Sequence, residues 1–148
     1  MSFELSFKVA WGDLDANGHM ANTAYLDYAS QSRFAYLATL GFGPAAFVAH
    51  GIGPVIFEDR LCYRRELRLL QPFSVSLHLS GLSSEGRHFA LENRFADDDG
   101  RLAATVRARA AWFDLEQRRV TQPPPPLREA WQTLPRSDDF EILRRQPT

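Results

Sequence analysis

The residues best suited to chemistry stand close together in one short stretch, Trp-Gly-Asp-Leu-Asp-Ala-Asn-Gly-His-Met-Ala-Asn-Thr-Ala-Tyr, which begins at Trp11. Two carboxylates, two amides and one imidazole fall within ten residues: Asp13, Asp15, Asn17, His19 and Asn22. A carboxylate and a histidine can supply a general base and the partner that orients it. The stretch therefore predicts a catalytic loop.

A helix must follow this loop. The spacing of apolar residues predicts a helix from Asn22 to Leu40, with Asn22 as its N-cap and Gly41 as a stop signal. A helix N-terminus offers unpaired N–H groups and the positive end of a dipole. It could therefore stabilise a developing oxyanion beside the loop. Arg33 falls inside the apolar arc of this helix, and a buried arginine needs a carboxylate partner.

Simpler interpretations of the same loop compete with catalysis. Asp13, Asp15 and Asn17 are common turn and capping residues. The spacing also resembles the start of a calcium-binding loop, but Ala24 takes the place of its bidentate glutamate. A metal site formed by Asp13, Asp15 and His19 would have no further histidine nearby. We therefore expect neither a metal nor a cofactor, and we keep the turn-forming role as the alternative.

The rest of the chain predicts an α+β fold. Apolar and polar residues alternate in five segments, as in half-buried strands: residues 3–11, 54–66, 73–80, 88–95 and 101–115. Gly86 and the Asp-Asp-Asp-Gly run ending at Gly100 mark hairpin turns between them. One strand, one long helix and then four strands favour an antiparallel sheet of about five strands, with the helix across one face.

Length and composition limit the domain organisation and the class of protein. The 148 residues suffice for one domain, and we expect it to span residues 1–121. A proline-rich C-terminal extension over 122–148, with a short helix over 127–134, would be an appendage. A single cysteine, Cys62, excludes an internal disulfide framework, and the net charge of −1 gives no bulk attraction for nucleic acid or acidic membranes.

No signal peptide and no membrane-spanning run is evident, so a cytoplasmic protein is expected. No Gly-x-Ser-x-Gly elbow is present, which argues against a serine hydrolase.

The stretch from Val9 to Leu40 resembles the hotdog-fold acyl thioesterases of the 4-hydroxybenzoyl-CoA thioesterase type. The run Leu-Asp-Ala-Asn-Gly-His-Met-Ala-Asn, which begins at Leu14, is also similar to the Leu-Asp-x-Asn-x-His-x-Asn-Asn loop of plant acyl-carrier-protein (ACP) thioesterases. The resemblance covers about residues 3–121. It implies a hotdog fold, in which the antiparallel sheet wraps around the long helix.

The resemblance also implies roles for individual residues. Asp15 matches the aspartate that acts as nucleophile or general base in the bacterial members. Asn17 and His19 match the pair that joins this aspartate in the plant type. The backbone N–H of Asn22 falls where the bacterial members place their oxyanion donor.

Two positions depart from the bacterial pattern. Many bacterial members carry a glutamate where this chain has Ser30, and others carry a catalytic histidine where it has Thr23. These differences favour the version with Asp15, Asn17 and His19.

The predicted function is hydrolysis of an acyl-CoA, or of an acyl-ACP, to free acid and thiol. A non-catalytic acyl-CoA-binding or scaffold protein is the alternative from another class. A hotdog hydratase or dehydratase acting on acyl thioesters is the alternative within the fold.

Arginine forks suit the phosphates of coenzyme A. Candidate substrate-binding residues are therefore Arg64, Arg65, Arg68 and Arg87, together with Tyr25 at the start of the helix. Solvated surface charge is the simpler reading of the arginines. Because an open sheet edge invites pairing with another chain, we expect a homodimer or a dimer of dimers, with active sites at the subunit interface as in hotdog proteins.

Overall fold

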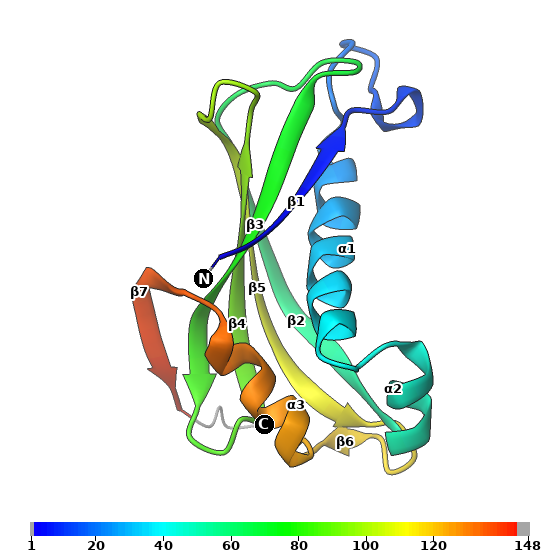
Figure 1. Cartoon of the computed structure of the whole chain (residues 1–148), viewed down its shortest axis with the longest axis vertical. Helices are drawn as coiled ribbons and strands as arrows, with labels where there is room; N and C mark the ends of the chain where they lie inside the picture. The colour runs from blue at the N-terminus through cyan, green and yellow to red at the C-terminus, as the bar shows by residue number, and fades with distance from the viewer. Residues whose placement is uncertain (1, 145–148) are drawn as a thin grey trace.

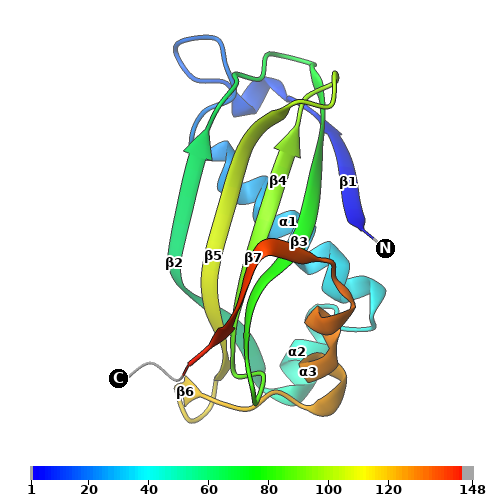
Figure 2. The same cartoon turned by 90° about the vertical axis from the view of Figure 1, so that its left-hand side faces the viewer.

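The structure, a computed structural model, describes residues 2–144. One long antiparallel sheet curls around one long helix (Figures 1 and 2). In chain order the elements are β1 (Phe3–Lys8), α1 (Ala24–Thr39), α2 (Pro44–His50), β2 (Ile52–Tyr63), β3 (Pro72–Ser83), β4 (His88–Ala96), β5 (Leu102–Asp114), β6 (Arg119–Val120), α3 (Pro125–Ala130) and β7 (Arg136–Leu143), with short 3-10 turns at Trp11–Asp13 and Trp131–Thr133.

The sheet has the strand order β1-β3-β4-β5-β2, and each of these neighbours is antiparallel. β6 pairs with β5, and β7 pairs in parallel with β3. Lys8 at the end of β1 lies opposite Pro72 at the start of β3, while Tyr63 at the end of β2 lies opposite Ala104 near the start of β5. The loops that follow β1 and β2 therefore lie at the same end of the sheet, at the top of Figure 1.

Strand alternation places one face of the sheet against α1. Along β3 the side chains facing the helix are apolar and buried, whereas the intervening ones are polar. The buried set on β3 is Phe73, Val75, Leu77 and Leu79. α1 packs against them through its own buried stripe, which includes Tyr25, Ala29, Tyr36 and Leu37. These contacts confirm the predicted arrangement of one long helix packed on an antiparallel sheet.

The predicted N-cap is wrong by one residue. Thr23, with helical φ −72° and ψ −27°, is the N-cap of α1, and no side chain caps this helix. Asn22 therefore lies just outside the helix. The hairpin turns are confirmed, since Gly86 and Gly100 adopt φ of +77° and +80°, a region that disfavours side chains.

Arg33 is the buried arginine that the helical pattern indicated, with 6% of its surface exposed. Its Nε donates to Oδ1 of Asn93 at 3.0 Å, and its Nη1 lies 3.9 Å from Oδ1 of Asp59. The predicted carboxylate partner is therefore present on β2. Burial lowers the pKa of Arg33, and Asp59 partly offsets that effect.

The described part of the expected extension shares the main core. Leu127 and Trp131 are almost completely buried, and Trp131 stacks on Trp112 of β5 with ring centroids 5.9 Å apart. β7 then crosses the outer face of the sheet, where Asp139 and Glu141 pair with arginines of β5 (Figure 2). This packing differs from the expected appendage. A proline run signals a stiff break, but it does not show whether the residues beyond it pack back.

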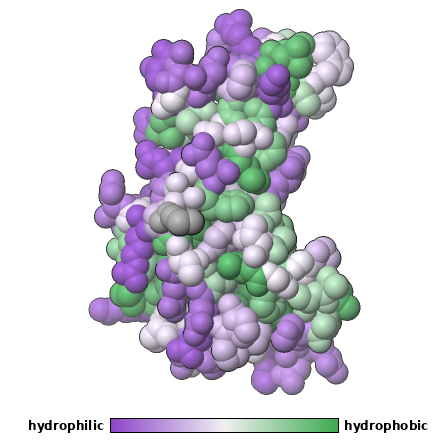
Figure 3. Space-filling view, in the orientation of Figure 1, coloured by the Kyte–Doolittle hydropathy of each residue, from purple (hydrophilic) through white to green (hydrophobic). Residues whose placement is uncertain are grey.

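The face of the molecule seen in Figure 3 carries both hydrophilic and hydrophobic residues. Figure 3 shows hydrophobic side chains reaching the surface over α2, at the lower right, where Val48 is 79% exposed. No helix within residues 2–144 is long and apolar enough to cross a membrane.

Candidate active site

The catalytic loop expected from the sequence is a closed turn beside the start of α1. Leu14 and Met20 face each other across an isolated antiparallel bridge. Inside it, the Asp15 N–H donates to the His19 carbonyl at 2.9 Å, and the Gly18 N–H donates to the Asp15 carbonyl at 3.1 Å. Gly18 has φ +78°, which a side chain would strain. These backbone hydrogen bonds help to fix the position of Asp15.

The Asp15 carboxylate is oriented but still open on one side. Its Oδ1 accepts the backbone N–H groups of Asn17, at 2.9 Å, and of His19, at 3.3 Å. Among the hydrogen bonds of residues 2–144, none reaches Oδ2, and Asp15 is exposed. One oxygen thus holds the turn, and the other is available to a water or a substrate.

Tyr25, in the first turn of α1, lies near the Asp15 carboxylate. Its ring is buried and meets Tyr63 edge-on, with centroids 5.2 Å apart. Burial, followed by the nearby Tyr63 and Asp15, raises the pKa of Tyr25 to about 12. Tyr25 therefore stays protonated in the physiological range, close enough to Asp15 to sense its charge. This is where the structure places the tyrosine expected to contact substrate.

His19 has a partner that the sequence did not reveal. Its Nε2 lies 2.8 Å from Oε2 of Glu66, and the other oxygen of Glu66 pairs with Arg68 at 2.5 Å. Glu66 belongs to the segment after β2, which also meets the loop through a bridge between His19 and Arg68. A carboxylate bound to one ring nitrogen orients an imidazole and sets its tautomer. Glu66 is thus a candidate functional residue that the sequence interpretation missed.

The two expected asparagines occupy different positions. Asn17 lies exposed in the turn, where its N–H binds Asp15. Asn22 lies between the turn and α1, and its carbonyl accepts the Tyr63 hydroxyl at 3.1 Å. Within the described chain, no group accepts a hydrogen bond from the Asn22 N–H. That amide is therefore free to serve as the expected oxyanion donor.

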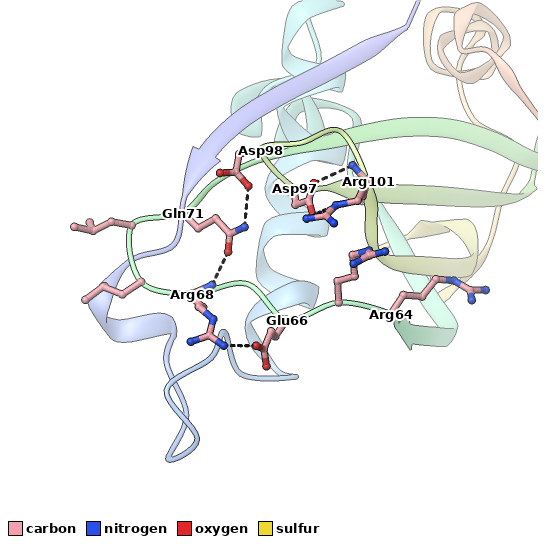
Figure 4. Close-up of a pocket in the computed structure, with 10 residues that line it drawn as sticks. Arg64, Glu66, Arg68, Gln71, Asp97, Asp98 and Arg101 are labelled. Carbon is pink, nitrogen blue, oxygen red and sulfur yellow. Dashed lines mark hydrogen bonds and ion pairs between the residues drawn. The ribbon is translucent and has the colours of Figure 1, made fainter.

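Three of the four expected arginines line one open groove of about 760 Å³ at this end of the sheet (Figure 4). They are Arg64, Arg65 and Arg68, and the groove also includes Arg101 from the turn before β5. Arg68 pairs with Glu66, and Arg101 pairs with Asp97 and Asp99. In the described chain no carboxylate pairs with Arg64 or Arg65, so their guanidinium groups remain available to an anion.

Arg87 does not join this groove. It lies in the β3–β4 turn, at the opposite end of the sheet, where it pairs with Glu85 at 2.8 Å. Any contact between Arg87 and a substrate bound at Asp15 of the same chain would require a ligand that runs the length of the sheet.

Asp13, the other carboxylate of the loop, is occupied by local structure. Asp13 accepts the Ala10 N–H at 2.9 Å and a short hydrogen bond from the Tyr28 hydroxyl. Burial, followed by this bond, raises the pKa of Tyr28 to about 12. Among residues 2–144, the acidic, histidine and cysteine side chains converge in threes only at Asp97, Asp98 and Asp99. Asp13, Asp15 and His19 do not form such a group.

Residues 9–131 match the model of the thioesterase-like superfamily. The chain belongs to this superfamily. The structure is also similar to a hypothetical protein from Staphylococcus aureus solved in complex with CoA, with a TM-score of 0.85, 18% identity, and coverage of 99% of this chain and 96% of that one. Since the identity is low, this likeness concerns the fold.

Two solved thioesterases have the same fold. The 1,4-dihydroxy-2-naphthoyl-CoA thioesterase of Synechocystis gives a TM-score of 0.80 at 14% identity, with coverage of 90% of this chain and 98% of that one. A gentisyl-coenzyme A thioesterase gives 0.76 at 23% identity, with coverage of 86% and 98%. The predicted hotdog fold and the resemblance to hotdog thioesterases are therefore confirmed.

Proposed function

We propose that this protein hydrolyses acyl-CoA thioesters, with Asp15 as nucleophile or general base. The observation that carries the proposal is the state of the Asp15 carboxylate. Two backbone N–H groups fix one of its oxygens, while the other has no hydrogen-bond partner within residues 2–144, and Asp15 is an exposed residue. A superfamily whose members include CoA thioesterases supports the same reaction for this chain.

In the general-base form, Asp15 takes a proton from a water molecule while the water oxygen attacks the thioester carbonyl carbon. The negative charge that develops on the carbonyl oxygen is stabilised by the Asn22 N–H and the dipole of α1. The carbon–sulfur bond then breaks, and the thiolate leaves with the proton that Asp15 accepted. In the nucleophilic form, Asp15 attacks the carbon itself, the carbon–sulfur bond breaks to release the thiolate, and a mixed anhydride with Asp15 forms. Water then hydrolyses this anhydride, which releases the free acid, regenerates the Asp15 carboxylate and supplies the proton for the thiol.

His19, held by Glu66, is suited to orient the attacking water or the carboxylate. Its backbone N–H already binds Asp15, and its ring is fixed by the carboxylate of Glu66. The groove beside it supplies Arg64 and Arg65, which lack carboxylate partners in the described chain. Guanidinium groups bind phosphate oxygens in pairs, which fits the CoA end of a substrate.

The test is a hydrolysis screen over acyl-CoA esters of varied length and aromaticity, with the released thiol measured for wild type and Asp15→Asn. The amide keeps the size of the side chain but removes the base. We expect kcat to fall by roughly 10²–10⁴, while KM changes much less.

Asp13→Asn is the matched control, because Asp13 stands two residues away and its carboxylate holds backbone and Tyr28. It should lower the melting temperature and affect kcat less than Asp15→Asn does. An Asp15→Asn protein that folds normally and retains near wild-type turnover would refute the proposal. A wild-type protein that binds acyl-CoA but hydrolyses none would point to the binding or scaffold alternative.

A further inference from the structure

Tyr63 makes a contact that ties β2 to the catalytic loop. It is the last residue of β2, and its hydroxyl donates to the Asn22 carbonyl at 3.1 Å across 41 residues of sequence. The Tyr63 ring is held edge-on against Tyr25. Burial raises the pKa of Tyr63, so its hydroxyl remains protonated and can act as the donor in this bond.

The bonded carbonyl belongs to the peptide group that precedes α1. Because a peptide group is planar and trans, fixing the Asn22 oxygen also fixes the plane that carries the Thr23 N–H. On either side, the Ala21 N–H donates to Asp13 at 2.7 Å, and the Ala24 N–H donates to Ala21 at 3.0 Å. Neither bond holds the peptide between Asn22 and Thr23.

That peptide has few other restraints. The N-cap of α1 has no side-chain hydrogen bond, although helix starts are commonly fixed in that way. In residues 2–144, the Asn22 and Thr23 N–H groups have no acceptor. Among residues 2–144, the hydrogen bond from the Tyr63 hydroxyl is therefore the one that fixes this peptide from outside its own loop.

We propose that Tyr63 is a positioning residue: through the Asn22 carbonyl it fixes the peptide that carries the Thr23 N–H, so that this amide can join the Asn22 N–H in binding the oxyanion. This inference rests on the proposed thioesterase function. It assigns Tyr63 an effect through the Asn22 carbonyl rather than a contact with the reacting atoms. The hydrogen bond from Tyr63 matters more in the transition state than in the ground state, because negative charge develops on the carbonyl oxygen of the substrate only during the reaction.

Tyr63→Phe tests this, because the ring and its contact with Tyr25 remain while the hydroxyl is lost. We expect kcat to fall roughly tenfold, less than the 10²–10³ for loss of an oxyanion donor itself, with KM nearly unchanged. Order in the backbone at Asn22 and Thr23, measured by ¹⁵N relaxation, should decrease. This second measurement does not depend on turnover.

Tyr36→Phe is the matched control. The Tyr36 hydroxyl also donates to a backbone carbonyl, that of Ala130 at 2.8 Å, but in the core under α3. Its loss should lower the melting temperature and leave kcat and the order at Asn22 unchanged.

A Tyr63→Phe protein with wild-type kcat, or with wild-type order at Asn22 and Thr23, would overturn the inference. If Asp15→Asn abolishes turnover in the same assay, the proposed function stands even when the Tyr63 inference fails. If Asp15→Asn retains turnover, the role assigned to Asp15 fails, and the relaxation measurement still decides whether Tyr63 positions the peptide.

Discussion

The His19 imidazole and the Glu66 carboxylate lie within hydrogen-bonding distance, with 2.8 Å between Nε2 and Oε2. A neutral imidazole that donates its Nε2–H to a carboxylate keeps the lone pair on Nδ1. In that neutral form, His19 can accept a hydrogen bond at Nδ1, on the side away from Glu66. The side chains of His19 and Glu66 are 31% and 45% exposed, so the pair stands at the surface, where a substrate can reach it.

Glu66→Gln should lower kcat roughly tenfold, because the amide no longer selects the tautomer and orientation of His19. KM should change less, since no substrate group is removed. The measurement is steady-state hydrolysis of the best acyl-CoA. Glu85→Gln is the control, because Glu85 is an exposed partner of an arginine at the other end of the sheet. Equal effects of the two substitutions would contradict an orienting role for Glu66.

The contact between His19 and Glu66 also shows what the sequence could not provide. Asp15, Asn17, His19 and Asn22 were found because they follow one another along the chain. Glu66 stands 47 positions after His19, directly after Arg65 and two residues before Arg68, and such a run of charges is equally typical of a solvated surface. Their proximity depends on the ends of β1 and β2 meeting at one end of the sheet, which only the strand order establishes.

The fold was easier to predict from the sequence than the site, because alternation of apolar and polar residues along a strand directly indicates that one face of the strand is buried. Strands β1 to β5 and helix α1 were all predicted, with ends that differ by a few residues. The packing of Trp131 and the course of β7 were not predicted. The pairing of β7 with β3 is interrupted by a register shift between Leu79 and Gly81. The residues of β7 also lack the regular alternation of buried and exposed positions that marks an inner strand.

Arg64→Ala and Arg65→Ala should each raise KM for acyl-CoA by roughly threefold to tenfold, the range that corresponds to losing one ordinary hydrogen bond of about 0.5–1.5 kcal/mol in a groove open to solvent. The effect on kcat should be smaller, because the phosphates lie far from the thioester. Arg87→Ala is the control at the other end of the sheet, where Arg87 pairs with Glu85. If KM is unchanged in both groove variants, the assignment of this groove to the CoA phosphates is wrong.

Asp139 anchors β7 to the sheet and should make stability depend on pH. Arg107 binds the Asp139 carboxylate through Nη1, 2.7 Å from Oδ2, and through Nη2, 3.0 Å from Oδ1. The Ser137 hydroxyl also donates to Oδ1 at 2.8 Å. The bond from Arg107 is the main cause that lowers the pKa of Asp139 from 3.8 to about 2. A lowered pKa in the folded state means that stability is present in full above pH 3.8 and is lost as the pH falls toward 2.

Asp139→Asn should therefore lower the melting temperature at pH 5 and have progressively less effect as the pH approaches 2. The effect should be modest, because the side chain is largely exposed and solvent screens the pair. Asp138→Asn, at a neighbouring position without a described ion pair, provides the control. A difference between Asp139→Asn and wild type that stays constant from pH 5 to pH 2 would contradict this account.

The last prediction concerns assembly through β2, which ends the strand order and exposes its outer edge. Ile56 and Phe57 on this strand are 44% and 60% exposed, and an open apolar edge favours pairing with a second copy. Light scattering at micromolar concentration should give a mass of at least twice the 16.8 kDa of one chain. Phe57→Asp should shift the protein to the monomer, because it places a charge on that edge. Ile142→Asp, at a 67% exposed site on β7, should leave the mass unchanged. A wild-type protein with the mass of one chain would exclude the dimer.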